Sequence, residues 1–171
     1  LCRRYGIYVM LDATRAGETP WFIKPRAVGY ADTSVARIRR EICDLSAGAT
    51  VSSKKDNLAN IGGFHALRDE ELARKARTLV VEFEGLHTYG GMSGRDMEAL
   101  AQGIREMVAT DDHVHARVGQ VEYLGEALVR AGVPIIQPTG GHGVFIDAMS
   151  VLPHISQDRF PAQALAAAIY I

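Results

Sequence analysis

Residues Ala49–Asp56 read ATVSSKKD, a short run of β-prone and small residues that ends in two serines, two lysines and an aspartate. A second apolar run, Ile7–Leu11 (IYVML), stops at Asp12 and suits a strand buried on both faces in a parallel sheet. Between the two runs, apolar residues recur at helical spacing, at Val35, Ile38, Ile42 and Leu45. From Asp12 to Lys55 the chain is therefore predicted to form one strand–helix–strand crossover, with both polar strand ends at one edge of the sheet.

The rest of the chain continues this mixture of helices and strands. Sequence patterns predict four helices. The first begins after a cap at Asp32 or Thr33, and the second begins after Ser93 and Asp96, which resemble a capping box. The third extends from Val114 to Leu128, and the fourth begins at Pro161. Gly48 is expected to break the first of them. Short strand-like runs lie at Val133–Ile136 and Gly143–Ile146. The predicted fold class is therefore α/β.

The composition is that of an ordinary soluble domain. Of the 171 residues, 47% are hydrophobic and 23% are charged, and the formal net charge is −1. Acidic and basic residues are mixed along the chain, so we expect no binding of nucleic acid or of an anionic membrane. No apolar run approaches the roughly 20 residues that cross a bilayer. Cys2 and Cys43 form no disulfide framework, which makes a reducing cytoplasm the expected setting.

The two ends of the sequence are unusual. The chain has no initiator Met, starts only a few residues before an apolar strand, and stops at Ala168–Ile171 inside an apolar helical pattern. Helices normally end with a polar turn, a glycine or a proline. We therefore expect a piece of a longer protein that is incomplete at both ends.

The adjacent lysines, Lys54 and Lys55, allow two interpretations. Burial and a second neighbouring cation both favour the neutral amine, a nucleophile that can form a Schiff base with an aldehyde cofactor. Lys-Lys-Asp is also a common sequence for a solvated turn, and spacing alone favours that interpretation. Asp12 and Arg15 are equally open. In one interpretation they form a structural ion pair at a strand end. In the other, the Asp12 carboxylate binds the ring nitrogen of pyridoxal phosphate and Arg15 supplies charge compensation.

Other polar residues give weaker signals. Ser52 and Ser53 could donate hydrogen bonds to a phosphate group. His113 and His115 follow two aspartates, but residues two apart point to different faces of a helix. A polar helix start is therefore favoured over a metal site at these histidines.

Taken together, the motifs resemble the β-eliminating lyases, the family that includes tryptophanase and tyrosine phenol-lyase. The similar segments occur in the family's order and approximate spacing over most of the chain: Leu11–Arg15, Ser52–Gly63, Tyr89–Ala99, Pro138–Asp147 and Gln157–Leu165. Such an ordered set is far more specific than a lone lysine. The resemblance implies pyridoxal 5'-phosphate as the cofactor.

The resemblance also implies roles for individual residues. Lys55 would be the Schiff-base lysine, Asp12 the partner of the pyridine nitrogen, and Arg15 a neighbour of the cofactor, and these three are the expected catalytic residues. Ser52 matches a serine that contacts the phosphate, and Lys54 matches a lysine that tunes the site.

The same resemblance implies a fold and an assembly. The fold would be fold type I of the pyridoxal-phosphate-dependent transferases, with an aspartate-aminotransferase-like large domain. Residues 1–171 would form part of this cofactor-binding domain, with the C-terminal end leading toward a small domain. Asn60 matches a position of the monovalent-cation site typical of the family, which implies K⁺ as a second cofactor. The parent protein would be a homotetramer that acts on a small-molecule amino-acid substrate.

The implied reaction is β-elimination at a carbon–carbon bond of an aromatic amino acid. Gly140–Asp147 and Phe160–Ala164 lean toward tryptophanase, which converts tryptophan to indole, pyruvate and ammonia. Ser93–Ala99 and Ile61–Phe64 lean toward tyrosine phenol-lyase, so tryptophan is favoured and tyrosine comes next. Two alternatives stay open: a non-catalytic remnant of the fold, and another enzyme of the same fold, such as an aminotransferase or an aldolase.

Overall fold

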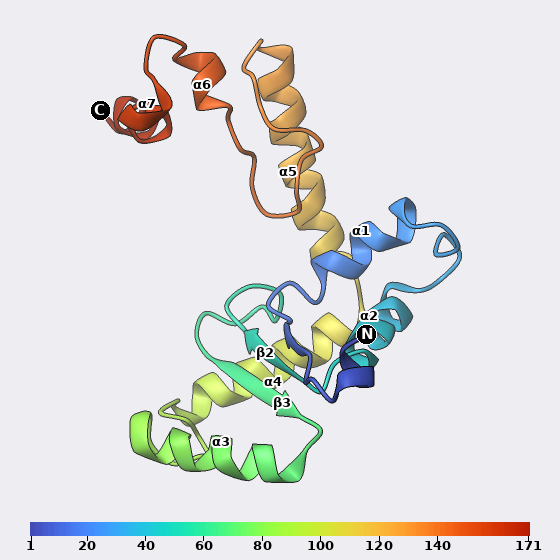
Figure 1. Ribbon diagram of the computed structural model, residues 1–171. Helices are drawn as coiled ribbons and strands as arrows, with labels where there is room; N and C mark the ends of the chain where they lie inside the picture. Colours follow the sequence, from blue (N-terminus) through green and yellow to red (C-terminus); the bar gives the residue numbers. More distant parts are fainter. The chain divides into compact units, whose positions relative to one another are not determined.

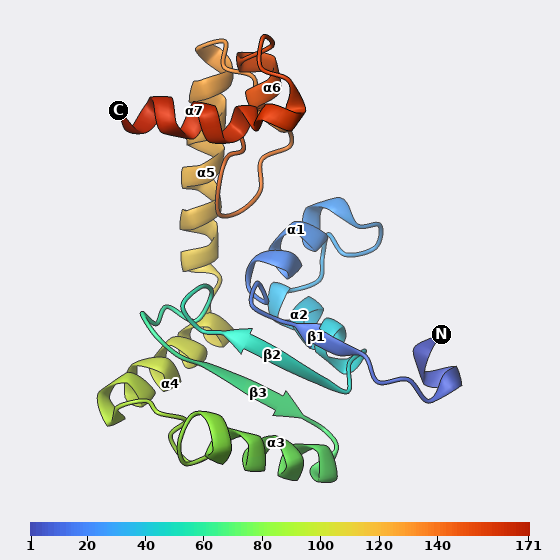
Figure 2. The same ribbon diagram turned by 60° about the vertical axis from the view of Figure 1, so that its left-hand side comes forward.

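The run that leads into the two lysines forms a strand, β2 (Gly48–Ser52), as predicted. In the computed structural model, which describes every residue of the chain except Arg3, β2 is the middle strand of a three-stranded sheet (Figure 2). Strand β1 (Met10–Asp12) pairs with β2 in parallel, and β3 (Gly63–Leu67) pairs with it antiparallel. Because Asp12 aligns with Thr50, both parallel strands end at the same edge. The predicted crossover and the α/β class are confirmed.

Strand β1 differs from the prediction in length and in burial. It begins at Met10 rather than at Ile7, and Ile7 and Tyr8 are 58% and 63% exposed. Among the described residues β1 pairs only with β2 and is therefore an edge strand. The prediction of a strand buried on both faces is thus wrong for this structure, because an apolar run does not reveal whether a neighbour covers it.

Two helices make the crossover, α1 (Glu18–Arg26) and α2 (Val35–Asp44), and they pack on each other. Helix α1 was not predicted because its prolines suggested a loop. Pro20 is tolerated in the first turn, where a backbone N–H has no partner within the helix. The predicted caps of α2 at Asp32 or Thr33 are wrong, since the Ser34 side chain accepts the hydrogen bond from the Arg37 N–H. The helix also ends before Gly48, at Asp44.

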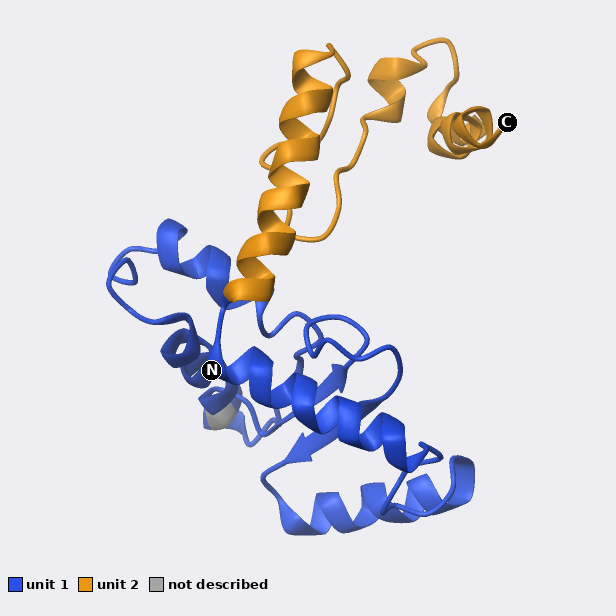
Figure 3. Cartoon of the chain, turned by 180° about the vertical axis from the view of Figure 1, so that it is seen from behind, with its two compact units in different colours: residues 1–111 blue, residues 112–171 orange. Residues whose placement is uncertain are grey.

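The remainder of this part of the chain holds α3 (Glu70–Phe83) and α4 (Gly94–Ala109). Helix α3 lies beside β3 and was not predicted. Helix α4 crosses one face of the sheet (Figure 1 and Figure 3). Its predicted cap at Ser93 is confirmed, because Ser93 Oγ accepts from the Asp96 N–H. The Asp96 carboxylate accepts from the Ser93 hydroxyl at 2.7 Å, so the described residues do not form the bond to the Ser93 backbone N–H that completes a capping box.

Residues Leu1–Asp111 form one compact unit, and Asp112–Ile171 form a second, coloured separately in Figure 3. The second unit contains α5 (Asp112–Arg130), the short α6 (Ala148–Val151) and α7 (Pro161–Tyr170). The helices predicted at Val114–Leu128 and from Pro161 are confirmed as α5 and α7. Short 3-10 helices lie at Cys2–Tyr5 and Gln157–Arg159.

The two strand-like runs predicted in the second unit are wrong as strands. Within the described residues they meet only at an isolated antiparallel bridge between Ile135 and Ile146. Arg117 of α5 holds the glycine turn between the runs, because its Nε donates to the Gly141 carbonyl at 3.1 Å. None of the described helices is long and apolar enough to span a bilayer.

Candidate functional site

The carboxyl ends of β1 and β2 lie side by side and bring together the two predicted polar clusters. The Ala13 N–H donates to the Thr50 carbonyl at 2.8 Å, and the Ser52 N–H donates to the Thr14 hydroxyl at 3.2 Å. These bonds join segments that are far apart in the sequence. The segment that starts at Asp12 and the loop that holds Lys55 are therefore neighbours, as the parallel crossover predicted.

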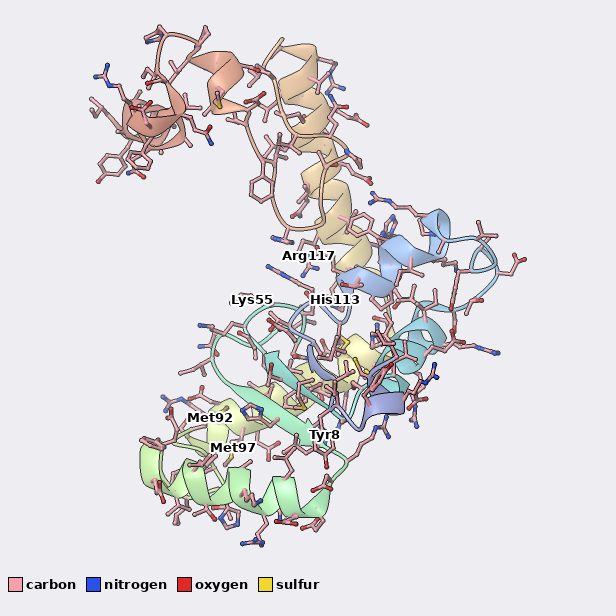
Figure 4. The ribbon with its side chains drawn as sticks, viewed as in Figure 1. Tyr8, Lys55, Met92, Met97, His113 and Arg117 are labelled. Carbon is pink, nitrogen blue, oxygen red and sulfur yellow. The ribbon has the colours of Figure 1, made fainter. Side chains whose placement is uncertain are left out.

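The two lysines differ in their surroundings. Both lie in the turn after β2, where Figure 4 marks Lys55. Lys54 is exposed, and Lys55 is half-buried. The described part of the chain supplies neither an ion pair nor a hydrogen bond for the Lys55 amine. A solvated turn therefore describes Lys54, whereas Lys55 is half-buried and none of the described acidic groups holds its amine.

Asp12, the last residue of β1, presents a carboxylate at the strand end. Its Oδ1 accepts from the Thr14 N–H at 3.1 Å. The hydrogen bond from the Thr14 side chain, followed by the one from its backbone, lowers the pKa of Asp12 below the ordinary aspartate value. The Asp12 side chain is exposed and is available to a cationic partner.

Arg15 does not pair with Asp12 in the described structure but with two other acids. Its NH1 group lies 3.6 Å from Asp56 Oδ1 and 4.0 Å from Glu18 Oε2. The ion pair between Asp12 and Arg15, one of the two interpretations drawn from the sequence, is therefore not formed here. Arg15 instead connects the end of β1 with the residue that follows Lys55.

Asp56 is a residue of this site that the sequence did not single out. It is 1% exposed, and its Oδ2 accepts from the Gly17 N–H at 2.8 Å and from the Glu18 N–H at 3.1 Å. These groups begin helix α1. An aspartate after two lysines carries no sequence signal for partners 39 and 38 residues away. Only its position next to a candidate lysine could have drawn attention to it.

Two polar side chains near Lys55 are buried without a described partner. The hydroxyl of Ser53 is fully buried, and the side-chain amide of Asn57 is 1% exposed. Buried polar groups nearly always have a hydrogen-bond partner, so these two are open to a ligand or a water molecule. Ser52 is half-buried, and its backbone N–H is already used by Thr14.

The predicted cation position, Asn60, is exposed in the loop between β2 and β3. No cluster of three or more His, Cys, Asp or Glu side chains suited to a metal ion occurs among the described residues. A cavity of about 50 Å³ lies beside the site and is lined in part by Asp12, Arg15 and Arg39. Cofactor pockets are commonly about 300–1,000 Å³, so this cavity alone does not enclose one.

Comparisons with known proteins show the family of the chain. The family model described as beta-eliminating lyase matches residues 1–170. The chain is 57% identical to tyrosine phenol-lyase of Symbiobacterium sp. (strain SC-1), 56% to that of Nostoc punctiforme and 52% to that of Clostridium tetani. Each alignment covers 100% of this chain but only 37%, 36% and 37% of the relative. The chain thus spans about a third of the length of these relatives.

The names of these relatives bear on the substrate expected from the motifs. Tryptophan was favoured on the strength of Gly140–Asp147 and Phe160–Ala164, and the relatives do not support that preference. The motifs that leaned toward tyrosine, Ser93–Ala99 and Ile61–Phe64, agree with the names.

Proposed function

The chain belongs to the β-eliminating lyase family, and from this premise we propose that it is the pyridoxal-phosphate-binding part of a lyase that acts on tyrosine. The proposed reaction converts tyrosine and water to phenol, pyruvate and ammonia. The names of the relatives support tyrosine as the substrate. One observation on the chain itself carries the proposal. Lys55 is half-buried, and its amine has no described acidic partner. It follows a strand whose end is hydrogen-bonded to the segment that begins at Asp12.

The residues at the two strand ends fit this cofactor. When bound, pyridoxal phosphate supplies an aldehyde for covalent attachment and a ring that draws electrons from the substrate. Lys55 Nζ would hold it covalently. Asp12, whose lowered pKa favours the carboxylate, would keep a proton on the ring nitrogen. Arg15 would add positive charge beside the ring, while its own contacts with Asp56 hold it in place.

Further donors would hold the phosphate group. We assign this contact to Ser52, with Lys54 adding a positive charge from the exposed side of the turn. The fully buried Ser53 hydroxyl, which has no described partner, is a donor that an anionic oxygen would satisfy. Asn60 would contribute to a site for a monovalent cation such as K⁺. Its exposed amide leaves room for ligands from elsewhere.

Lys55 would also carry the proton transfer that the reaction requires. Its amine is neutral once it has lost a proton, and a neutral amine can take the α-proton of the bound amino acid. The half-buried position limits competition by water. No acidic side chain among the described residues holds the amine in an ion pair, so it is free to act as a base.

At the level of the whole protein, we propose the fold-type-I large domain as the context of residues 1–171, with the C-terminal end leading toward a small domain. A homotetramer and a cytoplasmic location complete the proposal. These features are taken from the family resemblance.

The cofactor assignment is tested by covalent trapping. The chain is mixed with pyridoxal phosphate, reduced with borohydride and digested, and the modified residue is located by mass spectrometry. We expect the label on Lys55 in the wild type and in Lys54→Ala, and none in Lys55→Ala. Equal labelling of both lysines, or of neither, would contradict the proposal.

The substrate is tested in a chimera that replaces the matching segment of Symbiobacterium tyrosine phenol-lyase with this chain. We expect tyrosine to give phenol and pyruvate, and the Lys55→Ala chimera to give neither. Release of indole from tryptophan in preference to phenol would restore the tryptophan assignment. Amino-group transfer to a keto acid without pyruvate would contradict lyase activity.

A further inference from the structure

We propose that Asp56 is a positioning residue that fixes Lys55 relative to the Asp12–Arg15 segment. This inference rests on the proposed function, which makes Lys55 the residue that binds the cofactor. Asp56 follows Lys55 directly, and consecutive Cα atoms are about 3.8 Å apart. Whatever holds the Asp56 carboxylate therefore also restricts the backbone of Lys55.

The Asp56 carboxylate is held from one side by the segment that follows Asp12. Oδ2 accepts from the N–H groups of Gly17 and Glu18 at 2.8 and 3.1 Å, and Oδ1 lies 3.6 Å from Arg15. The side chain is 2% exposed. In such a buried place, hydrogen bonds to a carboxylate are stronger than neutral ones, and losing them leaves backbone donors unsatisfied.

The other side of the same loop rests against helix α4. A Cβ atom on Gly103 would overlap the carbonyl oxygen of Asn57, so helix and loop are in direct backbone contact. Upstream, the Ser53 N–H donates to the Gly62 carbonyl at 3.0 Å. The backbone is thus fixed just before and just after the two lysines.

If Asp56 served only to cap helix α1, a cap from a residue close in sequence would be sufficient. Helices α2, α3 and α4 are each capped by a local side chain, from Ser34, Asp69 and Ser93. The N-cap residue of α1, Gly17, provides no side-chain cap, and the carboxylate comes instead from the Lys55 loop. A serine or aspartate at position 17 would cap the helix locally. The long-range cap adds a connection between two segments of the site.

Competitive amine labelling of the cofactor-free chain tests this inference. A limiting amount of acetic anhydride modifies Lys54 and Lys55, and mass spectrometry gives the ratio of modified Lys55 to modified Lys54. The exposed Lys54 serves as the internal reference. We expect the ratio to rise at least fivefold in Asp56→Asn, because the loop loosens around the half-buried lysine. Asp44→Asn is the matched control, since Asp44 pairs with Arg40 and Arg68 on the surface, and its ratio should stay within twofold.

An unchanged ratio in a folded Asp56→Asn chain overturns the inference. If that variant does not fold, as judged by circular dichroism, Asp56→Glu replaces it. The glutamate keeps the charge but is one methylene longer, so it cannot accept both N–H groups without moving the backbone. We then expect a rise of at least twofold, and a wild-type ratio overturns the inference.

A second measurement separates this inference from the proposed function. Pyridoxal phosphate is added before the labelling, and the concentration that protects half of Lys55 is determined. We expect Asp56→Asn to need at least tenfold more cofactor than the wild type or Asp44→Asn, an effect that a mere helix cap would not produce. Absence of protection in the wild type would contradict the proposed function, while the cofactor-free ratio still decides the positioning role.

Discussion

Thr14 shows how a single side chain can organise a strand end. Its hydroxyl accepts from the Ser52 N–H, and its side chain and backbone both hydrogen-bond the Asp12 carboxylate. One residue therefore sets the spacing of two strand ends and the charge state of a site carboxylate. Threonine is short and β-branched, so little rotamer freedom is lost when it is fixed in this way.

Replacing Thr14 should change the titration of Asp12. In Thr14→Val the side-chain hydrogen bond is lost and the backbone one remains, so the pKa of Asp12 should rise part of the way toward its ordinary value. A lowered pKa stabilises the native state above the unfolded value of about 3.9, and this stability is lost as the pH falls through the native pKa. Unfolding at pH 7 and pH 3 should therefore differ less in Thr14→Val than in the wild type.

The measurements are an NMR titration of the Asp12 carboxyl group and denaturant unfolding at the two pH values. Thr110→Val is the control, because it removes an exposed hydroxyl from the end of α4. It should leave the titration of Asp12 as it is. An unchanged pKa of Asp12 in Thr14→Val would show that the hydroxyl does not stabilise the carboxylate.

The residues of the candidate site differ in how far their positions could be predicted from the sequence. Lys55 and Asp12 each lie at the end of a β-prone run, so their neighbourhood could be predicted from two strands joined by a parallel crossover. Thr14 and Asp56 act through backbone N–H groups more than 35 residues away. Such partners depend on the conformation of the loops, which the periodicity of the sequence does not predict. Sequence therefore predicted the place of the site better than its supports.

At the scale of elements, capping and periodicity located α2, α4, α5 and α7 but missed α3, although its cap at Asp69 is local. The cap at Ser93 and the start at Pro161 were predicted, whereas α1 was missed because Pro20 and Pro25 usually mark loops. The cap of α1 comes from Asp56 in another part of the chain. A helix stabilised by distant contacts gives little warning in its own residues.

Helix α4 and the Lys55 loop should be sensitive to one added methyl group. Gly103→Ala places a Cβ on the Asn57 carbonyl oxygen, so the backbone of helix or loop must move. We expect the free energy of unfolding to fall by about 1–3 kcal/mol, although alanine favours helix by about 1 kcal/mol over glycine. Denaturant unfolding gives the value. Gly94→Ala in the same helix is the control, because nothing lies within 4 Å of its Cβ position, and equal stability of the two variants would refute the contact.

At the scale of the whole molecule, the division into two units has no sequence signal. The boundary follows Asp111, between the end of α4 at Ala109 and the start of α5 at Asp112. No stretch rich in proline, glycine or serine marks it. Domain boundaries are usually predicted from flexible linkers. A boundary between two nearly contiguous helices escapes that rule, and the prediction that both units belong to one large domain stays a prediction.

The division does imply that the Lys55 loop can be formed by the first unit alone. Its contacts with Gly17, Glu18, Gly62 and Gly103 all lie within residues 1–111. A chain ending at residue 111 should therefore keep slow hydrogen exchange at the amides of Gly17, Glu18 and Ser53, measured by NMR and compared with the full chain. The same truncated chain with Asp56→Ala should lose protection at positions 17 and 18, because no side-chain acceptor remains. It should keep protection at Ser53, whose N–H is bonded to Gly62 and not to Asp56. Loss of protection at all three positions in the unsubstituted truncated chain would mean that residues 112–171 are needed to form the loop.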